Sequence, residues 1–445
     1  MTSEVIVMNN LAVALAADSA ATVSDGHDNK IYNSANKLFM LSKRHPVGVM
    51  VYNNSSLLGI PWETILKMFR ERLGETEFET LEEYGRELIS YLDKNEHLFP
   101  EAVQGKFYLN LVETLYRGIF STIRTKLLAN VLEGEDGRDL ESAETAKDIV
   151  RTSLKDWKEK ADVRCFADTI GPELAGRFSG EISQLTAKVF DGLALDNETT
   201  AALRELAILV VSKDDIVMES LSGLVIAGFG KNEYFPVLQI FEVGEVFLGR
   251  LKYREPKVER IDRDNQSVVR PFAQSEMVET FLQGINPVFE MRMIEEVVNL
   301  VVGFPDEVID AISDLTEEQK TAWKEKVLPN SSEAIRSFVN SLEKHRVEKH
   351  LGPIRQAIIN LPIDELAHVA ASLVNLNLFQ KRVSLSPETV GGPIDVAVIS
   401  KGDGFVWIDR KHYFRPELNH QFFKNYQITK STNGHEMREG HSNGN

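Results

Sequence analysis

Residues 5–20 read VIVMNNLAVALAADSA, two apolar runs separated by a pair of asparagines. Because asparagine tolerates the positive φ of tight hairpin turns, this stretch predicts two strands, Glu4–Met8 and Leu11–Asp18, joined at Asn9-Asn10. The run LAVALAA before a small residue also resembles the apolar part of a secretion signal. That interpretation is disfavoured, since the preceding residues carry Glu4 and no Lys or Arg, and the asparagines interrupt the run. The chain is therefore expected to begin with a β-hairpin.

The length of the hairpin turn decides which residue lies opposite Asp18. A two-residue turn places Thr2 opposite Ala17, whereas a three-residue loop places Thr2 opposite Asp18 itself. The two registers differ in the face of the sheet on which Asp18 lies, and the sequence does not choose between them. Both bring Asp18 beside the second residue of the chain.

Composition limits the classes of partner. The chain has 445 residues, with 67 acidic against 50 basic side chains and a formal net charge of −17. This charge opposes binding to nucleic acid and to anionic lipid. No apolar run reaches the roughly 18 residues of a membrane span, and Cys165, the single cysteine, excludes an intrachain disulfide or a cysteine-based zinc site. We expect a folded cytoplasmic protein with no nucleic-acid or membrane partner.

The spacing at which apolar residues recur changes several times along the chain. It alternates between strand-like segments and long stretches at helical spacing, which predicts an α+β fold with helical insertions. Predicted strands are residues 38–42, 47–52, 221–230, 234–243, 245–253, 394–400 and 404–410, and predicted helical regions are 62–210, 275–350 and 363–376. Capping boxes are predicted at Thr80–Glu83 and Thr316–Gln319. The polar tail, residues 431–445, is expected to be disordered.

The position of Thr2 suggests a chemistry. Removal of the initiator methionine would give Thr2 a hydroxyl and a free α-amine, whose ordinary pKa of about 7.7 to 8.0 leaves much of it neutral at physiological pH. One residue would then supply both nucleophile and base. A lysine and a carboxylate complete such a site, and Lys30 and Lys37 are the lysines that follow Asp18. This chemistry needs no metal or organic cofactor.

The segments LAVALAADSAATV and KIYNSANKLFML resemble the N-terminus of proteasome β-type subunits, which belong to the N-terminal-nucleophile hydrolase superfamily. The chain is similar to a divergent bacterial-type member with helical insertions. The resemblance implies that Thr2 is the nucleophile, Asp18 the active-site aspartate and Lys30 the active-site lysine. The segment between Thr22 and Lys30 is shorter than in the family, which leaves Lys37 as a substitute.

The same resemblance names supporting groups. It places the oxyanion donor, a backbone N–H, near Asn53 or Asn54, although the family's glycine is missing there. A supporting serine falls at Ser275, without the usual Gly-Ser-Gly, and Glu388 stands where the family has an aspartate. LVIAGFG and VGGPIDVAVISKGDG resemble later strands of the family.

The resemblance implies a four-layer αββα sandwich formed by residues 2–58, 221–283 and 360–414 within one domain, residues 1–430. Helical insertions would occupy about 60–215 and 285–350. The implied function is a threonine-type hydrolase of peptides or proteins that acts through an acyl-enzyme. Members of the family usually assemble into rings or related oligomers, so a homo-oligomer is expected here, and an ATP-driven unfoldase stays open as a partner. Two alternatives also stay open, a catalytically silent proteasome-like scaffold subunit and an acylase of a small amide.

Overall fold

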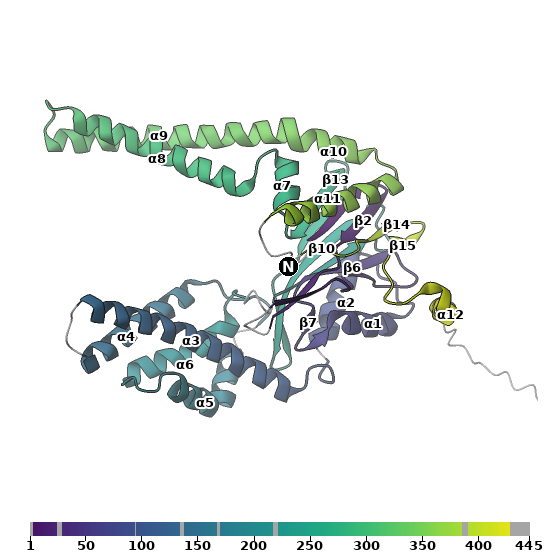
Figure 1. Ribbon diagram of the computed structural model, residues 1–445, viewed down its shortest axis with the longest axis horizontal. Coiled ribbons are helices and arrows are strands. Elements are labelled where there is room, and N and C mark those ends of the chain that lie inside the picture. Colours follow the sequence, from purple (N-terminus) through teal and green to yellow (C-terminus); the bar gives the residue numbers. More distant parts are fainter. Residues whose placement is uncertain are drawn as a thin grey trace, which may run out of the picture.

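The computed structural model describes residues 3–24, 29–93, 95–133, 138–166, 170–216, 221–384 and 390–427. Helices and sheets alternate along this part of the chain (Figure 1), which confirms the predicted α+β class. Thr2, Glu388 and the tail 431–445 lie outside the described residues. Within the described ranges, every helix is too short or too polar to cross a lipid bilayer.

The predicted N-terminal hairpin is present, but its register differs from both expected ones. Strands β1 (Ser3–Asn9) and β2 (Ala12–Ala17) pair Glu4 with Ala17, and the next pair along is Ser3 with Asp18, whose N–H donates to the Ser3 carbonyl at 3.0 Å. Asn9 is the cause, because it is the last residue of β1 rather than part of the turn.

The buried Asn9 side chain fixes this turn. Its Oδ1 accepts hydrogen bonds from the N–H groups of Leu11 and Ala12, at 2.9 and 3.3 Å. Its Nδ2 donates to the carbonyls of Ile358 and Leu361, at 3.1 and 2.9 Å. An asparagine that satisfies two turn N–H groups and binds a distant helix end belongs to the core, so the turn itself falls on the two residues after it.

A five-stranded sheet has the order β13-β1-β2-β14-β15. Strands β14 (Asp395–Ser400) and β15 (Gly404–Asp409) were predicted, whereas β13 (Ser267–Ala273) was not. Strand β13 contains Pro271, which removes a backbone donor and is tolerated because β13 lies at the sheet edge. The two partners of the hairpin thus come from chain segments far from it in sequence.

The second sheet has the order β11-β10-β9-β6-β5, and β12 (Lys257–Arg260) also pairs with β10. Its other strands are β5 (Leu38–Met40), β6 (Val47–Asn53), β9 (Ser222–Gly228), β10 (Val237–Phe247) and β11 (Arg250–Tyr253).

The sequence predicts a strand break at Gly244, but β10 continues through it with a shift of register between Val243 and Val246. The chain reverses later, at Leu248 and Gly249, which both have positive φ. Two short ribbons complete the strands, β3 (Ala21–Ser24) with β4 (Asn29–Tyr32) and β7 (Ser56–Leu57) with β8 (Ile60–Pro61).

Alternation along the strands sends their side chains into three apolar clusters. Val5, Val7 and Ala14 pack against α7 (Glu276–Gln283) and α11 (Ile363–Val383). Ile6, Met8 and Leu15 face the second sheet. The far side of the second sheet packs against α1 (Trp62–Leu73) and α2 (Leu81–Asp93). Each of these faces is thus covered by its own apolar cluster.

Two helical units extend from this core (Figure 1). Helices α3 (Glu101–Glu133), α4 (Arg138–Glu159), α5 (Ile170–Val189) and α6 (Asn197–Ser212) pack around their own apolar cluster, which Phe247 of β10 joins. Helices α8 (Pro287–Ala311) and α9 (Glu317–Arg346) form a projecting hairpin in which only Ile309 and Ser331 are buried. The capping box at Thr316 is confirmed. The shorter elements are η1 (Val347–Leu351), α10 (Gly352–Ile359), η2 (Pro416–Leu418) and α12 (His420–Gln427).

Candidate active site

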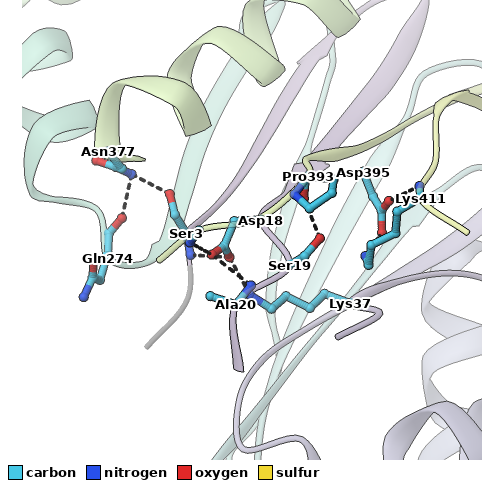
Figure 2. Close-up of polar contacts among 11 residues, drawn as sticks. Ser3, Asp18, Ser19, Ala20, Lys37, Gln274, Asn377, Pro393, Asp395 and Lys411 are labelled. Carbon is cyan, nitrogen blue, oxygen red and sulfur yellow. Dashed lines mark hydrogen bonds and ion pairs between the residues drawn. The ribbon is translucent and has the colours of Figure 1, made fainter. Parts of the chain in front are cut away.

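Asp18 follows the last residue of β2 and is buried against the first described residue of β1 (Figure 2). Its Oδ1 accepts a hydrogen bond from the Ser3 N–H at 3.0 Å. Its Oδ2 accepts from the N–H groups of Ala20 and Gly391, at 3.3 and 3.0 Å. These donors replace the hydrogen bonds with water that the carboxylate loses on burial. Asp18 thus connects both hairpin strands with the segment that enters β14.

The cation beside Asp18 is Lys37. Its Nζ forms an ion pair with Asp18 Oδ1, and the two side chains are 6% and 0% exposed. Lys37 lies one residue before β5, and its carbonyl accepts a hydrogen bond of 2.9 Å from the Val51 N–H of β6. The lysine backbone is therefore held by the second sheet while its ammonium group reaches the first.

Lys30, which the sequence favours for this position, lies elsewhere. It is exposed on β4, opposite Val23 of β3, and its Nζ is 5.1 Å from the ring centre of Tyr32. Lys30 is exposed whereas Asp18 is buried, and the lysine that forms an ion pair with that carboxylate is Lys37. A signal for Lys37 was present in the sequence, since it directly precedes a buried strand and therefore lies where the chain enters the sheet.

A buried asparagine, which the sequence analysis missed, holds the start of β1. Asn377 of α11 is 2% exposed, and its Nδ2 donates to the Ser3 hydroxyl at 2.8 Å and to the Gln274 carbonyl at 2.7 Å (Figure 2). Its signal is weak, because a lone asparagine in an apolar helix is common. The contact fixes the corner where β1, β13 and α7 meet.

The predicted supporting serine, Ser275, belongs to this corner. It lies two residues after Ala273, which pairs with Ser3, and it is the N-cap residue of α7 without a capping hydrogen bond from its side chain. Strand pairing therefore places Ala273, two residues before Ser275, opposite the start of β1. Glu388, the other predicted supporting residue, lies outside the described part of the chain.

The segment before β14 is fastened to Ser19, the residue after Asp18. The Ser19 N–H donates to the Gly391 carbonyl at 3.1 Å, and the Ser19 hydroxyl donates to the Pro393 carbonyl. Gly392 has a φ of +78°, and a Cβ there would lie 2.9 Å from Asn33 Cβ, so only glycine fits well. The Gly-Gly pair noted in the sequence thus allows this segment to reach Asp18.

The expected oxyanion donor lies at the end of β6. Asn53 is exposed and has a φ of 63°, while the Asn54 N–H donates to the Leu221 carbonyl at 3.1 Å. Backbone N–H groups alternate in direction along a strand, so the Asn53 N–H points to the same side as the Val51 N–H, which bonds to Lys37. Asn54 is therefore already paired, and Asn53 is the better placed of the two.

Comparisons with known proteins found no matching protein-family model and no matching curated protein. Solved structures that match include a Gly-1 mutant of Anbu from Hyphomicrobium sp. strain MC1, at 11% identity and a TM-score of 0.26, covering 96% of this chain and 95% of that one. Another is Anbu, described as an ancestral beta-subunit, from Yersinia bercovieri, at 10% identity and a TM-score of 0.25, covering 96% of this chain and 98% of that one. TM-scores this low do not support assigning the role of any residue in either protein to a residue of this chain.

Proposed function

We propose that the chain is a threonine-type amide hydrolase, most specifically a peptidase, in which Thr2 is the nucleophile after removal of Met1. The observation that supports this is the buried Asp18–Lys37 pair beside the Ser3 N–H, the group that is covalently joined to Thr2. A carboxylate, a lysine and an N-terminal threonine are the groups that this chemistry requires. Asp18 and Lys37 come together from two different sheets.

In the proposed reaction, the Thr2 α-amine accepts the proton of the Thr2 hydroxyl as its oxygen attacks the substrate carbonyl carbon. Lys37 disfavours a second positive charge on that amine, and Asp18 holds Lys37 in place. The Asn53 N–H stabilises the negative oxygen of the tetrahedral intermediate. The C–N bond breaks as the leaving amine takes the proton from the Thr2 amine, and water then hydrolyses the ester on Thr2.

We further propose that the fold is the four-layer αββα sandwich of N-terminal-nucleophile hydrolases, within one domain of residues 1–430. The order of packing, α7 and α11, two sheets, then α1 and α2, supports this. Residues of about 60–215 and 285–350 would be insertions, in line with the separate apolar cluster of α3–α6 and the projecting α8–α9 hairpin. Assembly into a homo-oligomer, and delivery of substrate by an unfoldase, belong to the same proposal.

A catalytically silent scaffold subunit is the second candidate. The observation that favours it is that three backbone N–H groups, those of Ser3, Ala20 and Gly391, bind the Asp18 carboxylate besides Lys37. A carboxylate that accepts hydrogen bonds from three separate backbone segments stabilises the fold whether or not a reaction occurs. The two functions differ in whether Thr2 acts as a nucleophile.

The mass of the purified N-terminus separates the two. Catalysis requires a chain that begins at Thr2 with a free amine, so retained Met1 or an acetylated Thr2 would contradict it. Labelling by a peptide epoxyketone and peptide hydrolysis should both disappear in Thr2→Ala and persist in Thr76→Ala, a control in an exposed turn. Hydrolysis that is unchanged in Thr2→Ala would exclude Thr2 as nucleophile.

A further inference from the structure

A cavity of about 670 Å³ lies between α3 and the β7–β8 hairpin, beside Asn54 at the end of β6. One face of α3 forms a wall of it, because its lining residues follow one another at helical spacing. Four of its eleven lining residues have apolar side chains, Leu58, Val103, Phe107 and Leu111. The two titratable groups among its lining residues are Glu245 and Lys106.

Glu245 is the unusual member of this cavity, because it is 4% exposed and carries a carboxyl group. It lies in β10 where the register with β11 shifts, and such a bulge redirects a side chain. Its Oε2 accepts one hydrogen bond, from the Leu58 N–H at 2.9 Å, and within the described ranges no lysine or arginine forms an ion pair with it. A buried carboxyl with a single neutral donor lacks the cation that usually accompanies it.

Burial raises the pKa of Glu245 to about 8. Near pH 7 this group is therefore largely the neutral acid, and an arriving cation would favour its ionised form. Lys106 does not supply that cation, because it is exposed on α3 and forms no ion pair with Glu245 among the described contacts.

The cavity lies close to the candidate active site. Asn54, which lines it, is three residues after Val51, whose N–H bonds to the Lys37 carbonyl. Three residues of chain span at most about 11 Å. A peptide held at the active site could thus place one of its side chains in the cavity.

We propose that this cavity binds a basic side chain, lysine or arginine, of a peptide substrate, with Glu245 as the group that contacts its charged end. The proposal rests on the proposed function for the identity of the ligand as substrate. The apolar side chains in the wall, such as Phe107 and Leu111, suit the methylene stem of such a side chain, and a buried carboxylate suits its ammonium or guanidinium group. The chain's net charge of −17 also favours cationic over anionic peptides.

Calorimetric titration with N-acetyl-arginine amide and its neutral isostere N-acetyl-citrulline amide tests this without relying on turnover. The intact chain should bind the arginine compound about tenfold more tightly, and Glu245→Gln should reduce this preference to less than about twofold. Lys106→Met, which removes a like charge, should keep or increase the preference, and Glu255→Gln, in an exposed ion pair, should leave it unchanged. Equal binding of the two compounds, or a preference that survives in Glu245→Gln, would overturn the proposal.

A second variant tests the proposal independently, in case Glu245→Gln does not fold. Val103 is 41% exposed at the cavity, so Val103→Trp should fold and should block binding of the arginine compound. Undiminished binding to Val103→Trp would place the ligand elsewhere and refute the proposal. Thr2→Ala should lose hydrolysis and keep binding. If the intact chain shows Glu245-dependent binding but hydrolyses no peptide, the proposed function fails while the cation site stands.

Discussion

The ammonium group of Lys37 contacts the carboxylate of Asp18 in the interior of the protein, and neither side chain is more than 6% exposed. Both groups lose their hydration on folding, so each depends on the other for compensation. The pair also connects the two sheets, because Asp18 follows β2 and Lys37 precedes β5. Substitutions at the two candidate lysines can therefore distinguish the paired lysine from the exposed one.

Lys37→Met should destabilise the fold by about 3 kcal/mol, because it leaves the buried Asp18 carboxylate without its cation. It should also abolish peptide hydrolysis. Lys30→Met is the matched control, and it should change stability by less than about 0.5 kcal/mol, since Lys30 is exposed. Urea unfolding and a peptide hydrolysis assay on both variants measure these effects. Equal losses in the two variants would argue against the role of Lys37.

Asn377→Leu should cost about 2 kcal/mol, because it removes two hydrogen bonds from a buried corner. It should also slow hydrolysis, since the Ser3 hydroxyl that follows Thr2 loses its donor. Asn375→Leu is a control on the same helix with an exposed side chain, and it should have little effect on either quantity. Thermal unfolding and initial rates of peptide hydrolysis measure these effects. If Asn377→Leu hydrolysed peptide at the rate of the intact chain, Asn377 would have no positioning role.

Glu245 should make the protein less stable as pH rises. Its pKa is about 8 when folded and about 4.3 when unfolded, so between these values the folded state binds more protons than the unfolded state. The free energy of unfolding should therefore fall as pH rises from about 4.3 to about 8, by up to about 1.4 kcal/mol per pH unit from this group. Glu245→Gln should lose this contribution, so that its stability relative to the intact chain increases with pH. Denaturant titrations at several pH values measure this free energy, with Glu255→Gln as the control. If the free energy of unfolding of Glu245→Gln and of the intact chain changed with pH in parallel, the pKa of Glu245 would not be raised.

Two glycines should respond oppositely to alanine. Gly228, at the end of β9, has a φ of +138°, and a Cβ there would lie 1.9 Å from the Pro46 carbonyl oxygen. Gly228→Ala should cost about 2 to 4 kcal/mol. Gly118 is exposed in the middle of α3, where a Cβ meets nothing within 4 Å, and Gly118→Ala should stabilise by about 0.5 to 1 kcal/mol. Melting temperatures that shift in the same direction for both would contradict this account.

Periodic apolar patterns predicted the buried elements well. Spacing alone predicted a helix from Trp62, and α1 covers Trp62–Leu73 because Ile65, Leu66 and Phe69 all face the second sheet. Strand β13 escaped prediction because an edge strand needs only one apolar face and tolerates Pro271. The continuation of β10 through Gly244 depends on a bulge, which no apolar pattern reveals.

The candidate site was less predictable than the fold. Asp18 follows from the hairpin, but the sequence offers two lysines as its partner, and only the tertiary structure shows that Lys37 forms the ion pair. Asn377 is separated from Ser3 by most of the chain, so only the packing of α11 on β1 shows their contact. Glu245 is similarly buried within β10, and only the fold shows its contact with the Leu58 N–H. The positions of these groups relative to their partners are set by tertiary contacts, which local sequence patterns do not reveal.

The interleaved order of the five-stranded sheet has a consequence for the timing of synthesis. Strand β2 pairs with β14, about 380 residues later, and β1 pairs with β13. At translation rates of about 5 to 20 residues per second, the first hairpin waits roughly 20 to 80 s on the ribosome before β14 is made. During that time the chain's start is open to aminopeptidases and acetyltransferases, so its processing and the closure of the sheet around it compete in time.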